Sequence, residues 1–406
     1  MKLIYCTNSF PYGLGEQWKA NELKQLVNYF DEITVVPFHY DGNFTNPQPQ
    51  IKGVTYLKPL FQSSSLTVSK SDLVSFLFNR HVWIFLKEFF NKKVFSSKAK
   101  LTSWAVATKR SQLLLAHPVM SKLISDADKQ TVFYFYWGKG SCEIMPFINP
   151  EKICKSFIRM HRYDLFEYVN DGYIPYRTAQ LKNVTVAAPS SVAGVEHLQK
   201  LYPAFKHKIQ VFRCGTVGNG KKSTASSDSI LRVVSCSLLS PVKRVHLMIE
   251  ALQFIDFPIK WHHIGDGVLY DELVALAQQL NVADKFIFEG RIDSKKILDF
   301  YTAGTFDVFV NVSESEGVPF SIMEAFSAAI PVIATNVGGT GEMVIPGTGL
   351  LVDKDVSAKE LAAAISKFYH FTNEEKGALR NKCTEEYINK WNAEKLAKDL
   401  GEYLVK

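Results

Sequence analysis

Short apolar runs alternate with longer stretches of helical periodicity along the whole chain. Most of these runs are continuously apolar rather than alternating, which is typical of strands that helices cover on both faces. The expected strands are Lys2–Cys6, Ile33–Phe38, Thr131–Trp137, Ser156–His161, Val184–Ala188, Ile209–Arg213, Leu231–Ser237, Ile259–Ile264, Lys285–Glu289, Asp307–Val312, Val332–Thr335 and Leu350–Val352. Strand–helix alternation in both halves predicts an α/β fold with doubly wound parallel sheets.

A polar stretch separates the two halves. Residues 216–229 read TVGNGKKSTASSDS and lack apolar periodicity, as interdomain linkers do. We therefore expect two Rossmann-like domains, residues 1–215 and 230–385, and a C-terminal helix within 386–406 that could pack back on the first domain. Ligands of such sheets bind at the carboxyl ends of the strands, so the two domains are expected to face each other across a functional cleft.

Composition and charge narrow the class of protein. The 406 residues are 47% apolar and 21% charged, which excludes a fibrous or wholly disordered chain. The net charge of +7 is concentrated between Lys70 and Ile124, where ten Lys or Arg face two acids, Asp72 and Glu88. Aromatic residues interleave with these cations, a pattern that suits an anionic membrane surface. The alternative is a helical layer with its rings in the core and its lysines solvated.

Several other classes of protein and site are disfavoured. No nucleic-acid-binding motif accompanies the basic segment. The six cysteines are scattered without a C-x-x-C pair or a nearby histidine cluster, which argues against a disulfide scaffold and a structural zinc site. We see neither a signal peptide nor an apolar run of about 18 residues. The expected location is cytoplasmic, either free or peripheral at the inner face of the plasma membrane.

The segment Asp307–Val344 carries the clearest chemistry. A buried strand leads into the polar loop Ser313–Gly317, and a helix is expected to start near Pro319. The backbone amides of such a helix start form an anion site that suits a phosphate. Carboxylates beside a phosphate are repelled unless they accept hydrogen bonds, and sugar hydroxyls donate such bonds well. With Glu316 and Glu324 flanking this site, the segment points to a nucleotide sugar.

The spacing Glu316-x7-Glu324 within SEGVPFSIMEAFSAAIPVIATNVGG resembles the signature of retaining GT-B glycosyltransferases of family four. Val233–Leu252, Ile264–Gly267 and Phe288–Ile292 resemble further landmarks of that family in the same order. The resemblance covers essentially the whole second domain. It implies a GT-B fold, and further segments point to the branch active in bacterial capsule, exopolysaccharide or O-antigen assembly.

The resemblance implies roles for individual residues of the second domain. Glu324 would hold the ribose hydroxyls, Glu316 the donor-sugar hydroxyls, and Lys243 would neutralise the diphosphate without a metal. The remaining donor-site candidates are Gly317, Val318, Pro319, Phe320 and Ser321 at the phosphate, Gly265 in the IGDG segment, and Arg291 and Ile292 beside the base. The family commonly has an arginine where Leu238 stands, so either Arg244 replaces it or Ser240 and the amides suffice.

The first domain offers two candidate segments. Phe10–Glu16 places Gly13 and Gly15 in the loop after the first strand, as a diphosphate or acceptor contact or as a plain turn. Its glycines do not form a dinucleotide fingerprint.

His161 ends an apolar strand and is the second candidate, as a sugar contact or a structural histidine. Arg162 and Asp164 follow it in an H-x-Y-D segment that resembles the polysaccharide branch, as do Tyr136–Trp137 and the arginine strand end at Arg213.

These features predict a retaining glycosyltransferase that moves a hexose from a UDP- or GDP-sugar to a hydroxyl of a glycan, with a lipid-linked intermediate of bacterial surface polysaccharide as the expected acceptor. Glu316, Lys243 and His161 are the catalytic candidates, and no metal or other cofactor is expected. The alternatives are a nucleotide-sugar 2-epimerase on the same architecture and a non-catalytic glycan-binding protein. A nicotinamide oxidoreductase is disfavoured because the G-x-G-x-x-G fingerprint is missing.

Overall fold

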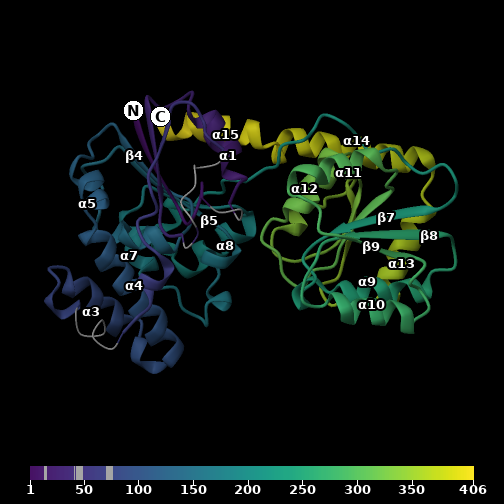
Figure 1. Cartoon of the computed structure of the whole chain (residues 1–406), viewed down its shortest axis with the longest axis horizontal. Coiled ribbons are helices and arrows are strands. Elements are labelled where there is room, and N and C mark those ends of the chain that lie inside the picture. The colour runs from purple at the N-terminus through teal and green to yellow at the C-terminus, as the bar shows by residue number, and fades with distance from the viewer. Residues whose placement is uncertain (13–15, 41, 43–48, 70–75) are drawn as a thin grey trace. The chain divides into compact units, whose positions relative to one another are not determined.

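The computed structural model describes residues 1–12, 16–40, 42, 49–69 and 76–406 (Figure 1). The chain divides into two compact units. The first comprises Met1–Phe212 together with Ala397–Lys406, and the second comprises Arg213–Leu396.

In the described part of the chain, the first unit contains one six-stranded parallel sheet with the strand order β3-β2-β1-β4-β5-β6. Its strands are β1 (Lys2–Thr7), β2 (Glu32–Pro37), β3 (Val54–Tyr56), β4 (Thr131–Phe135), β5 (Lys155–Met160) and β6 (Val186–Pro189). The expected strand Ile209–Arg213 is wrong, because the structure pairs only Ile209 with Ala187 in an isolated bridge. Strand β3 was not expected, since three residues are too few to establish a pattern.

Helices cover both faces of this sheet. The described helices up to residue 212 are α1 (Lys19–Leu26), α3 (Val82–Asn91), α4 (Lys98–Ala116), α5 (Pro118–Ser125), α6 (Arg162–Leu165), α7 (Arg177–Asn183) and α8 (Val192–Leu201), and of these α3 packs on α4 in a separate cluster. Within β1, Ile4 and Cys6 join one buried cluster, while Leu3 and Tyr5 join the other. Burial on both faces explains why the strands read as continuous apolar runs.

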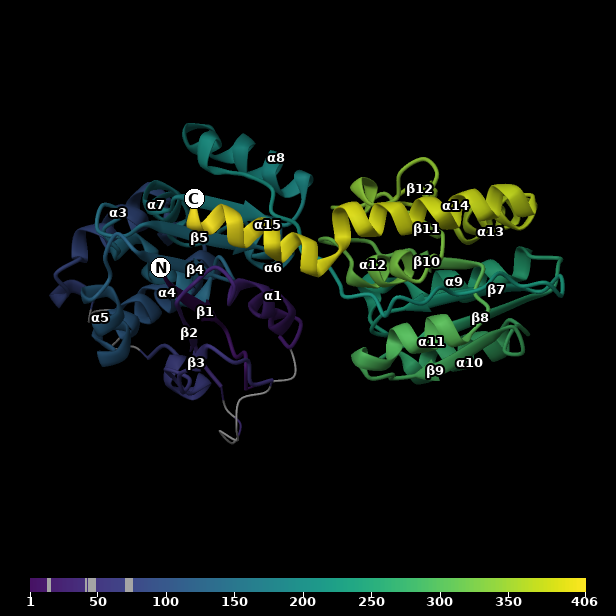
Figure 2. The ribbon, with the colours of Figure 1, turned by 90° about the horizontal axis from the view of Figure 1, so that it is seen from above.

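The last helix, α15 (Ala393–Val405), completes the core of the first unit. Leu400 and Leu404 are buried in the same cluster as Leu3 and Tyr5. The ring of Tyr403 meets that of Phe212 at 4.8 Å between centroids. Figure 2 shows α15 running alongside β5, the strand whose first residue donates a hydrogen bond to the Tyr403 carbonyl.

The described part of the second unit contains another six-stranded parallel sheet, in the order β12-β11-β10-β7-β8-β9. Its strands are β7 (Leu231–Cys236), β8 (Ile259–Ile264), β9 (Phe286–Gly290), β10 (Val308–Asn311), β11 (Val332–Thr335) and β12 (Gly349–Val352). Its helices are α9 (Val245–Ala251), α10 (Tyr270–Gln279), α11 (Ile297–Ala303), α12 (Phe320–Ser327), α13 (Ala358–Tyr369) and α14 (Asn373–Glu386).

The stretch 216–229, expected to be a linker, lies within the second unit. The backbone amide and hydroxyl of Ser226 donate to the carboxylate of Asp307 at 2.9 and 2.6 Å. Thr224 pairs with Thr305 in an isolated bridge. These bonds attach the stretch to the residues that lead into β10.

Each sheet has a topological switch point, the place where the strand order reverses direction. It lies between β1 and β4 in the first sheet and between β7 and β10 in the second. The loops that leave the carboxyl ends of such neighbouring strands diverge, and ligands of open α/β sheets bind in the resulting crevice. The functional residues of each unit are therefore expected in these loops.

The packing of α15 predicts a loss of stability on truncating a buried leucine. We expect Leu404→Ala to lower the free energy of unfolding of the first unit by about 2–5 kcal/mol, because it opens a cavity in the core. Hydrogen exchange of the β1 and β5 amides measures the effect. Lys398→Ala, on the exposed face of the same helix, serves as the control. Equal protection in the two variants would contradict the described packing.

Candidate active site

An ion pair bridges the two loops at the switch point of the second unit. Lys243 follows β7 and Glu316 follows β10, and the distance from Lys243 Nζ to Glu316 Oε1 is 2.6 Å. The two side chains are only 24% and 10% exposed. Asn311, at the end of β10, donates a second hydrogen bond to Glu316 Oε1 at 3.3 Å. Among the described residues, both hydrogen bonds reach Oε1, so Oε2 is available to a ligand.

The loop after β10 has a defined shape. The amide of Glu314 donates to the carbonyl of Val242, which ties this loop to the loop after β7. Gly339 donates to the carbonyl of Gly317 at 2.7 Å. Gly338 has a φ of +53°, and a Cβ there would lie 1.9 Å from the Glu316 carbonyl oxygen. Only glycine fits this close approach, so the loop after β11 fixes the backbone of Glu316.

Helix α12 begins directly after this loop, with Pro319 as its N-cap. The first turn of an α-helix carries backbone amides that have no acceptor within the helix. No side chain caps this helix in the described structure. The candidate residues Gly317, Val318, Pro319, Phe320 and Ser321 surround this helix start, which can stabilise an anion.

Glu324 lies on α12, half-buried. Among the described residues, no hydrogen bond reaches its carboxylate. Burial raises the pKa of Glu324 to about 7. A carboxylate in this position gains stability from hydroxyl donors of a ligand, because they compensate the charge that burial disfavours. The two carboxylates of the E-x7-E pair thus have different surroundings. Glu316 is paired with a lysine, whereas the Glu324 carboxylate accepts no hydrogen bond from the described residues.

Arg244 and Gly265 have structural contacts in the same region. Arg244 has a left-handed backbone, and its Nε donates to the carbonyl of Val312 at 2.7 Å, which ties it to the end of β10. Gly265 follows β8 with a φ of +148°, and a Cβ there would lie 1.8 Å from the Ser237 carbonyl oxygen. Gly265 therefore permits close packing of the loops after β7 and β8. Leu238 is exposed.

Arg291 and Ile292 follow β9 at the same edge of the sheet. Arg291 is exposed, and Ile292 is half-buried against the core. A half-buried apolar residue and an exposed cation at a strand end are compatible with a base-binding position.

At the switch point of the first unit, Glu16 connects the loops after β1 and β4. Its Oε2 accepts from the backbone amides of Ser9 and Phe10, both at 2.8 Å. Its Oε1 pairs with Lys19 and accepts from the indole N–H of Trp137. Lys19 is fully buried, with Nζ 4.1 Å from the ring centre of Tyr136, and burial lowers the pKa of Lys19 to about 8.

Lys19 was not expected as a site residue. Glu16 ended the candidate loop Phe10–Glu16 and Trp137 belonged to the Tyr136–Trp137 element, but neither was given a role of its own. The available signal was a glutamate at the end of a glycine-containing loop with a lysine three residues later. This spacing brings two charges together at the start of a helix.

His161 lies beside this cluster. Its ring is stacked on Tyr136 at 5.5 Å between centroids and tilted against Trp137 at 4.9 Å. Burial and the neighbouring cations Arg159 and Lys19 lower the pKa of His161 well below its usual range, so the ring is neutral. Within the described structure its buried Nε2 has no hydrogen-bond partner. A neutral imidazole in this position can bind a ligand hydroxyl.

Asp164 is buried and holds the loop in place. It accepts from the amide of His161 at 2.7 Å and from that of Gly138, and Arg177 donates to its backbone carbonyl. Burial raises the pKa of Asp164 to about 6. These bonds give Asp164 a role in positioning His161 at the start of α6.

The remaining candidates from this part of the sequence lie in three different places. Arg162 is half-buried at the first position of α6, next to His161. Gly13 and Gly15 lie outside the described residues. Arg213 belongs to the second unit, where its Nη2 lies 2.6 Å from Glu342 and its guanidinium lies over the ring of Trp391.

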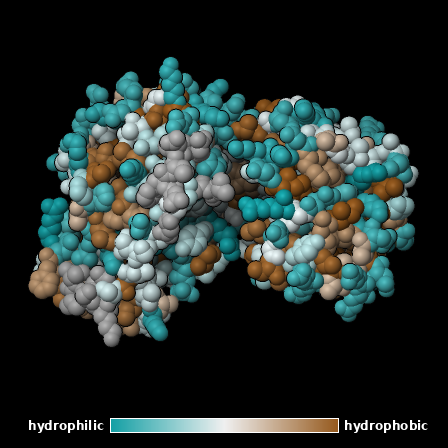
Figure 3. All heavy atoms as spheres, in the orientation of Figure 1, coloured by the Kyte–Doolittle hydropathy of each residue, from teal (hydrophilic) through white to brown (hydrophobic). Residues whose placement is uncertain are grey.

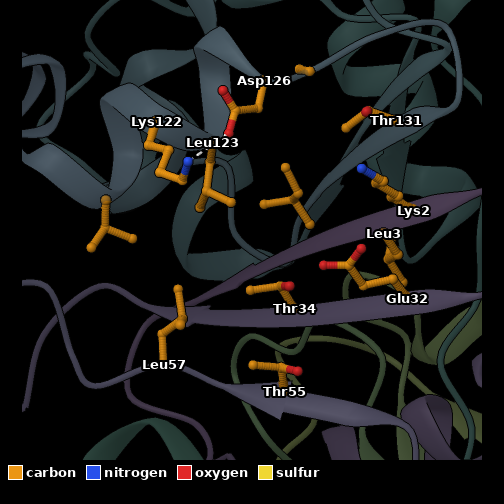
Figure 4. Close-up of a pocket in the computed structure, with 13 residues that line it drawn as sticks. Lys2, Leu3, Glu32, Thr34, Thr55, Leu57, Lys122, Leu123, Asp126 and Thr131 are labelled. Carbon is orange, nitrogen blue, oxygen red and sulfur yellow. Dashed lines mark ion pairs between the residues drawn. The ribbon is translucent and has the colours of Figure 1, made fainter.

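A pocket of about 320 Å³ opens at the opposite edge of the first sheet (Figure 4). Lys2, Glu32 and Thr131, at the amino-terminal ends of their strands, line it together with α5 residues such as Leu123. It is thus remote from the carboxyl-end loops.

The described residues contain no group of three or more His, Cys, Asp or Glu that could hold a metal ion. None of the described helices combines the length and the apolar character that a membrane span requires.

Sequence comparison places the second unit among known domains. Residues 221–389 match the family model "Glycosyl transferases group 1". The chain is 33% identical over 156 residues to an uncharacterized glycosyltransferase, MJ1178, of Methanocaldococcus jannaschii, covering 38% of this chain and 42% of that protein. It is 37% identical over 92 residues to the O-antigen biosynthesis glycosyltransferase WbnH of Escherichia coli, covering 23% and 25%. The chain thus spans less than half the length of these relatives.

Similarity of structure extends over both units. The crystal structure of Anabaena Alr3699/HepE in complex with UDP is similar over 100% of this chain and 99% of that chain, with a TM-score of 0.63 and 17% identity. At this identity the similarity shows the fold, which is GT-B.

The surroundings of Glu324 predict a pH-dependent effect of its neutral analogue. Because burial raises the pKa of Glu324 in the folded state, the contribution of Glu324 to stability falls as the pH rises from about 5 through 7. Glu324→Gln does not titrate. We expect the variant to gain roughly 2–3 kcal/mol relative to the wild type between pH 5 and pH 8, measured by thermal unfolding. The exposed Glu374→Gln should show no such trend. Parallel pH profiles for wild type and Glu324→Gln would contradict the assignment.

Proposed function

Residues 221–389 form a glycosyl transferases group 1 domain within a chain of GT-B fold, and from this premise we propose that the protein is a retaining glycosyltransferase. It moves a hexose from a UDP- or GDP-sugar to a hydroxyl of a glycan. The observation that carries the proposal is the Lys243–Glu316 pair at the switch point, beside the start of α12.

The Lys243–Glu316 pair, the start of α12 and Glu324 provide contacts for the diphosphate, the donor sugar and the ribose of a nucleotide sugar. The Lys243 ammonium and the first turn of α12 stabilise the negative charge that builds up on the leaving diphosphate. Glu316 accepts a donor-sugar hydroxyl at its Oε2, and Glu324 accepts the ribose hydroxyls. The UDP in the structure of the Anabaena protein supports a nucleotide diphosphate as the donor's leaving group.

We propose that transfer proceeds with retention and without a metal. The bond between the anomeric carbon and the diphosphate oxygen breaks, and the bond to the acceptor oxygen forms on the same face. The acceptor proton passes to the departing diphosphate oxygen, so the protein supplies position and charge stabilisation rather than a nucleophile. Neutral His161 binds a sugar hydroxyl. Lys243 and the α12 amides supply the positive charge that a metal ion supplies elsewhere.

The acceptor is proposed to be a lipid-linked intermediate of a bacterial surface polysaccharide. The relative named for O-antigen biosynthesis supports this class of acceptor. Such an acceptor lies at the inner face of the plasma membrane, where the protein would act as a peripheral enzyme.

The proposal predicts that Lys243→Ala lowers the turnover of the nucleotide sugar by about 10²–10³-fold, because the leaving group loses its cation. Release of UDP or GDP from a panel of nucleotide sugars measures turnover, and NMR of the product reports its anomeric configuration. Lys359→Ala, an exposed lysine on α13, is the matched control.

Loss of Lys243 also leaves Glu316 without its cation, which lowers stability. The double variant Lys243→Ala/Glu316→Gln leaves no uncompensated carboxylate at position 316 and separates a folding defect from a loss of turnover. A folded double variant with wild-type turnover would overturn the proposed transfer reaction. A product of inverted anomeric configuration would overturn the retaining mechanism.

A further inference from the structure

Four aromatic side chains around α3 lie on the surface of the first unit instead of in its core. Phe78 is 92% exposed, Trp83 76%, Phe90 61% and Phe95 62%. We refer to these four residues as the aromatic face. Exposure of large rings at this level is costly in water and marks an interaction surface when several lie together.

Other aromatic residues of the same segment do form a core. Phe76, Phe85 and Trp104 are buried in one cluster with Tyr173 and Tyr176. The structure therefore divides the aromatic residues of the basic segment into two groups. A helical layer whose rings all face the interior does not account for the aromatic face.

Helix α3 presents two distinct sides. Trp83, Lys87 and Phe90 are spaced at i, i+4 and i+7, which places them on one side of the helix, and all three are exposed. Phe85 and Glu88 are buried on the other side. The outward side thus combines large rings with a cation.

The single acid of residues 76–125, Glu88, is withdrawn from the surface. It accepts hydrogen bonds from the Tyr173 hydroxyl and the Tyr176 amide, both at 2.9 Å. Meanwhile Arg80, Lys87, Lys93 and Lys98 are exposed. The surface around the aromatic face is therefore cationic without a compensating acid among the described residues of this segment.

The aromatic face is continuous at its C-terminal end. The ring of Phe89 lies 5.4 Å from that of Phe90 and 6.0 Å from that of Phe95, which joins the two exposed rings into one patch. Figure 3 shows hydrophobic side chains at the surface of the corner where Figure 1 places α3, with hydrophilic ones beside them.

We propose that the aromatic face docks on a bilayer that contains anionic lipids, with its rings at the headgroup boundary and Arg80, Lys87, Lys93 and Lys98 on the lipid phosphates. Charge complementarity favours this occupant, because rings flanked by cations match an anionic interface. A second copy docked about a two-fold axis would bring cations against cations. The inference rests on the proposed function, because docking on the bilayer would bring the enzyme to its proposed lipid-linked acceptor.

Co-flotation of the full chain with vesicles tests the proposal. We expect binding to phosphatidylcholine vesicles that contain phosphatidylglycerol, weaker binding in high salt, and no binding to phosphatidylcholine alone. Two variants remove one feature each: the aromatic variant carries Phe78→Ser, Trp83→Ser, Phe90→Ser and Phe95→Ser, and the charge variant carries Arg80→Gln, Lys87→Gln, Lys93→Gln and Lys98→Gln. Each should weaken binding at least about tenfold.

Matched controls carry the same kinds of change elsewhere on the surface. Phe254→Ser/Ile388→Ser controls for lost exposed hydrophobic side chains, and a set of four exposed lysines controls for lost charge. That set is Lys182→Gln, Lys354→Gln, Lys359→Gln and Lys398→Gln. Both controls should bind as the wild type does.

The proposal is overturned if the wild type ignores the anionic vesicles or if both face variants bind them as tightly as the wild type. It is also overturned if sedimentation velocity shows that the wild type is a dimer and the aromatic variant is a monomer. Nucleotide release without vesicles is measured in parallel and should be unchanged in every variant. Vesicle binding without any nucleotide release would reject the proposed transfer reaction and leave the docking surface standing.

Discussion

A charge taken out of water must be compensated by an opposite charge or by hydrogen bonds, and both units meet this requirement at their switch points. In the second unit Lys243 compensates Glu316, and in the first unit Glu16 compensates the buried Lys19. In each case a charged side chain links the two loops that diverge where the strand order reverses. The ion pair in the second unit thus holds together the loops that form the candidate phosphate site. Glu324 is the exception, since no group of the described protein compensates it.

This contrast between the two carboxylates of the second unit gives them separate tasks. Glu316 is already bound to a cation, so its position is set before a ligand arrives. Burial of the Glu324 carboxylate costs free energy, and hydrogen bonds from a ligand's hydroxyls can offset that cost. The region around Glu324 is therefore more stable when the ligand is bound. Glu316 is preorganised, and Glu324 becomes more stable when a ligand binds. A site of this kind links affinity for the nucleotide to the protonation of a single side chain.

Much of the fold follows from local patterns. Ile259–Ile264 and Val332–Thr335 are strands with the predicted bounds, because continuous apolar runs flanked by polar turns suit a sheet covered on both faces. Residues 209–213 have a similar pattern, but they form only an isolated bridge from Ile209 to Ala187 and single backbone hydrogen bonds from Gln210 and Phe212 to β6, not a regular strand. The E-x7-E spacing identified Glu316 and Glu324. It could not show that Lys243 reaches Glu316, because that contact depends on the order of strands in space. For the same reason the sequence could not show that Lys19 is buried beside Glu16, or which aromatic residues near α3 are buried and which are exposed.

Helix α15 returns the last residues of the chain to the first unit, where Leu400 and Leu404 fill the core around Leu3 and Tyr5. This arrangement has a consequence for synthesis on the ribosome. The second unit is contiguous in sequence and can fold as soon as it has emerged. The first unit is made almost entirely beforehand, and α1 already packs on one face of its sheet, yet the part of that face that Leu400 and Leu404 cover stays exposed until α15 is translated. The older half of the nascent chain therefore finishes folding last, and its exposed apolar surface during that interval is a natural target for chaperones.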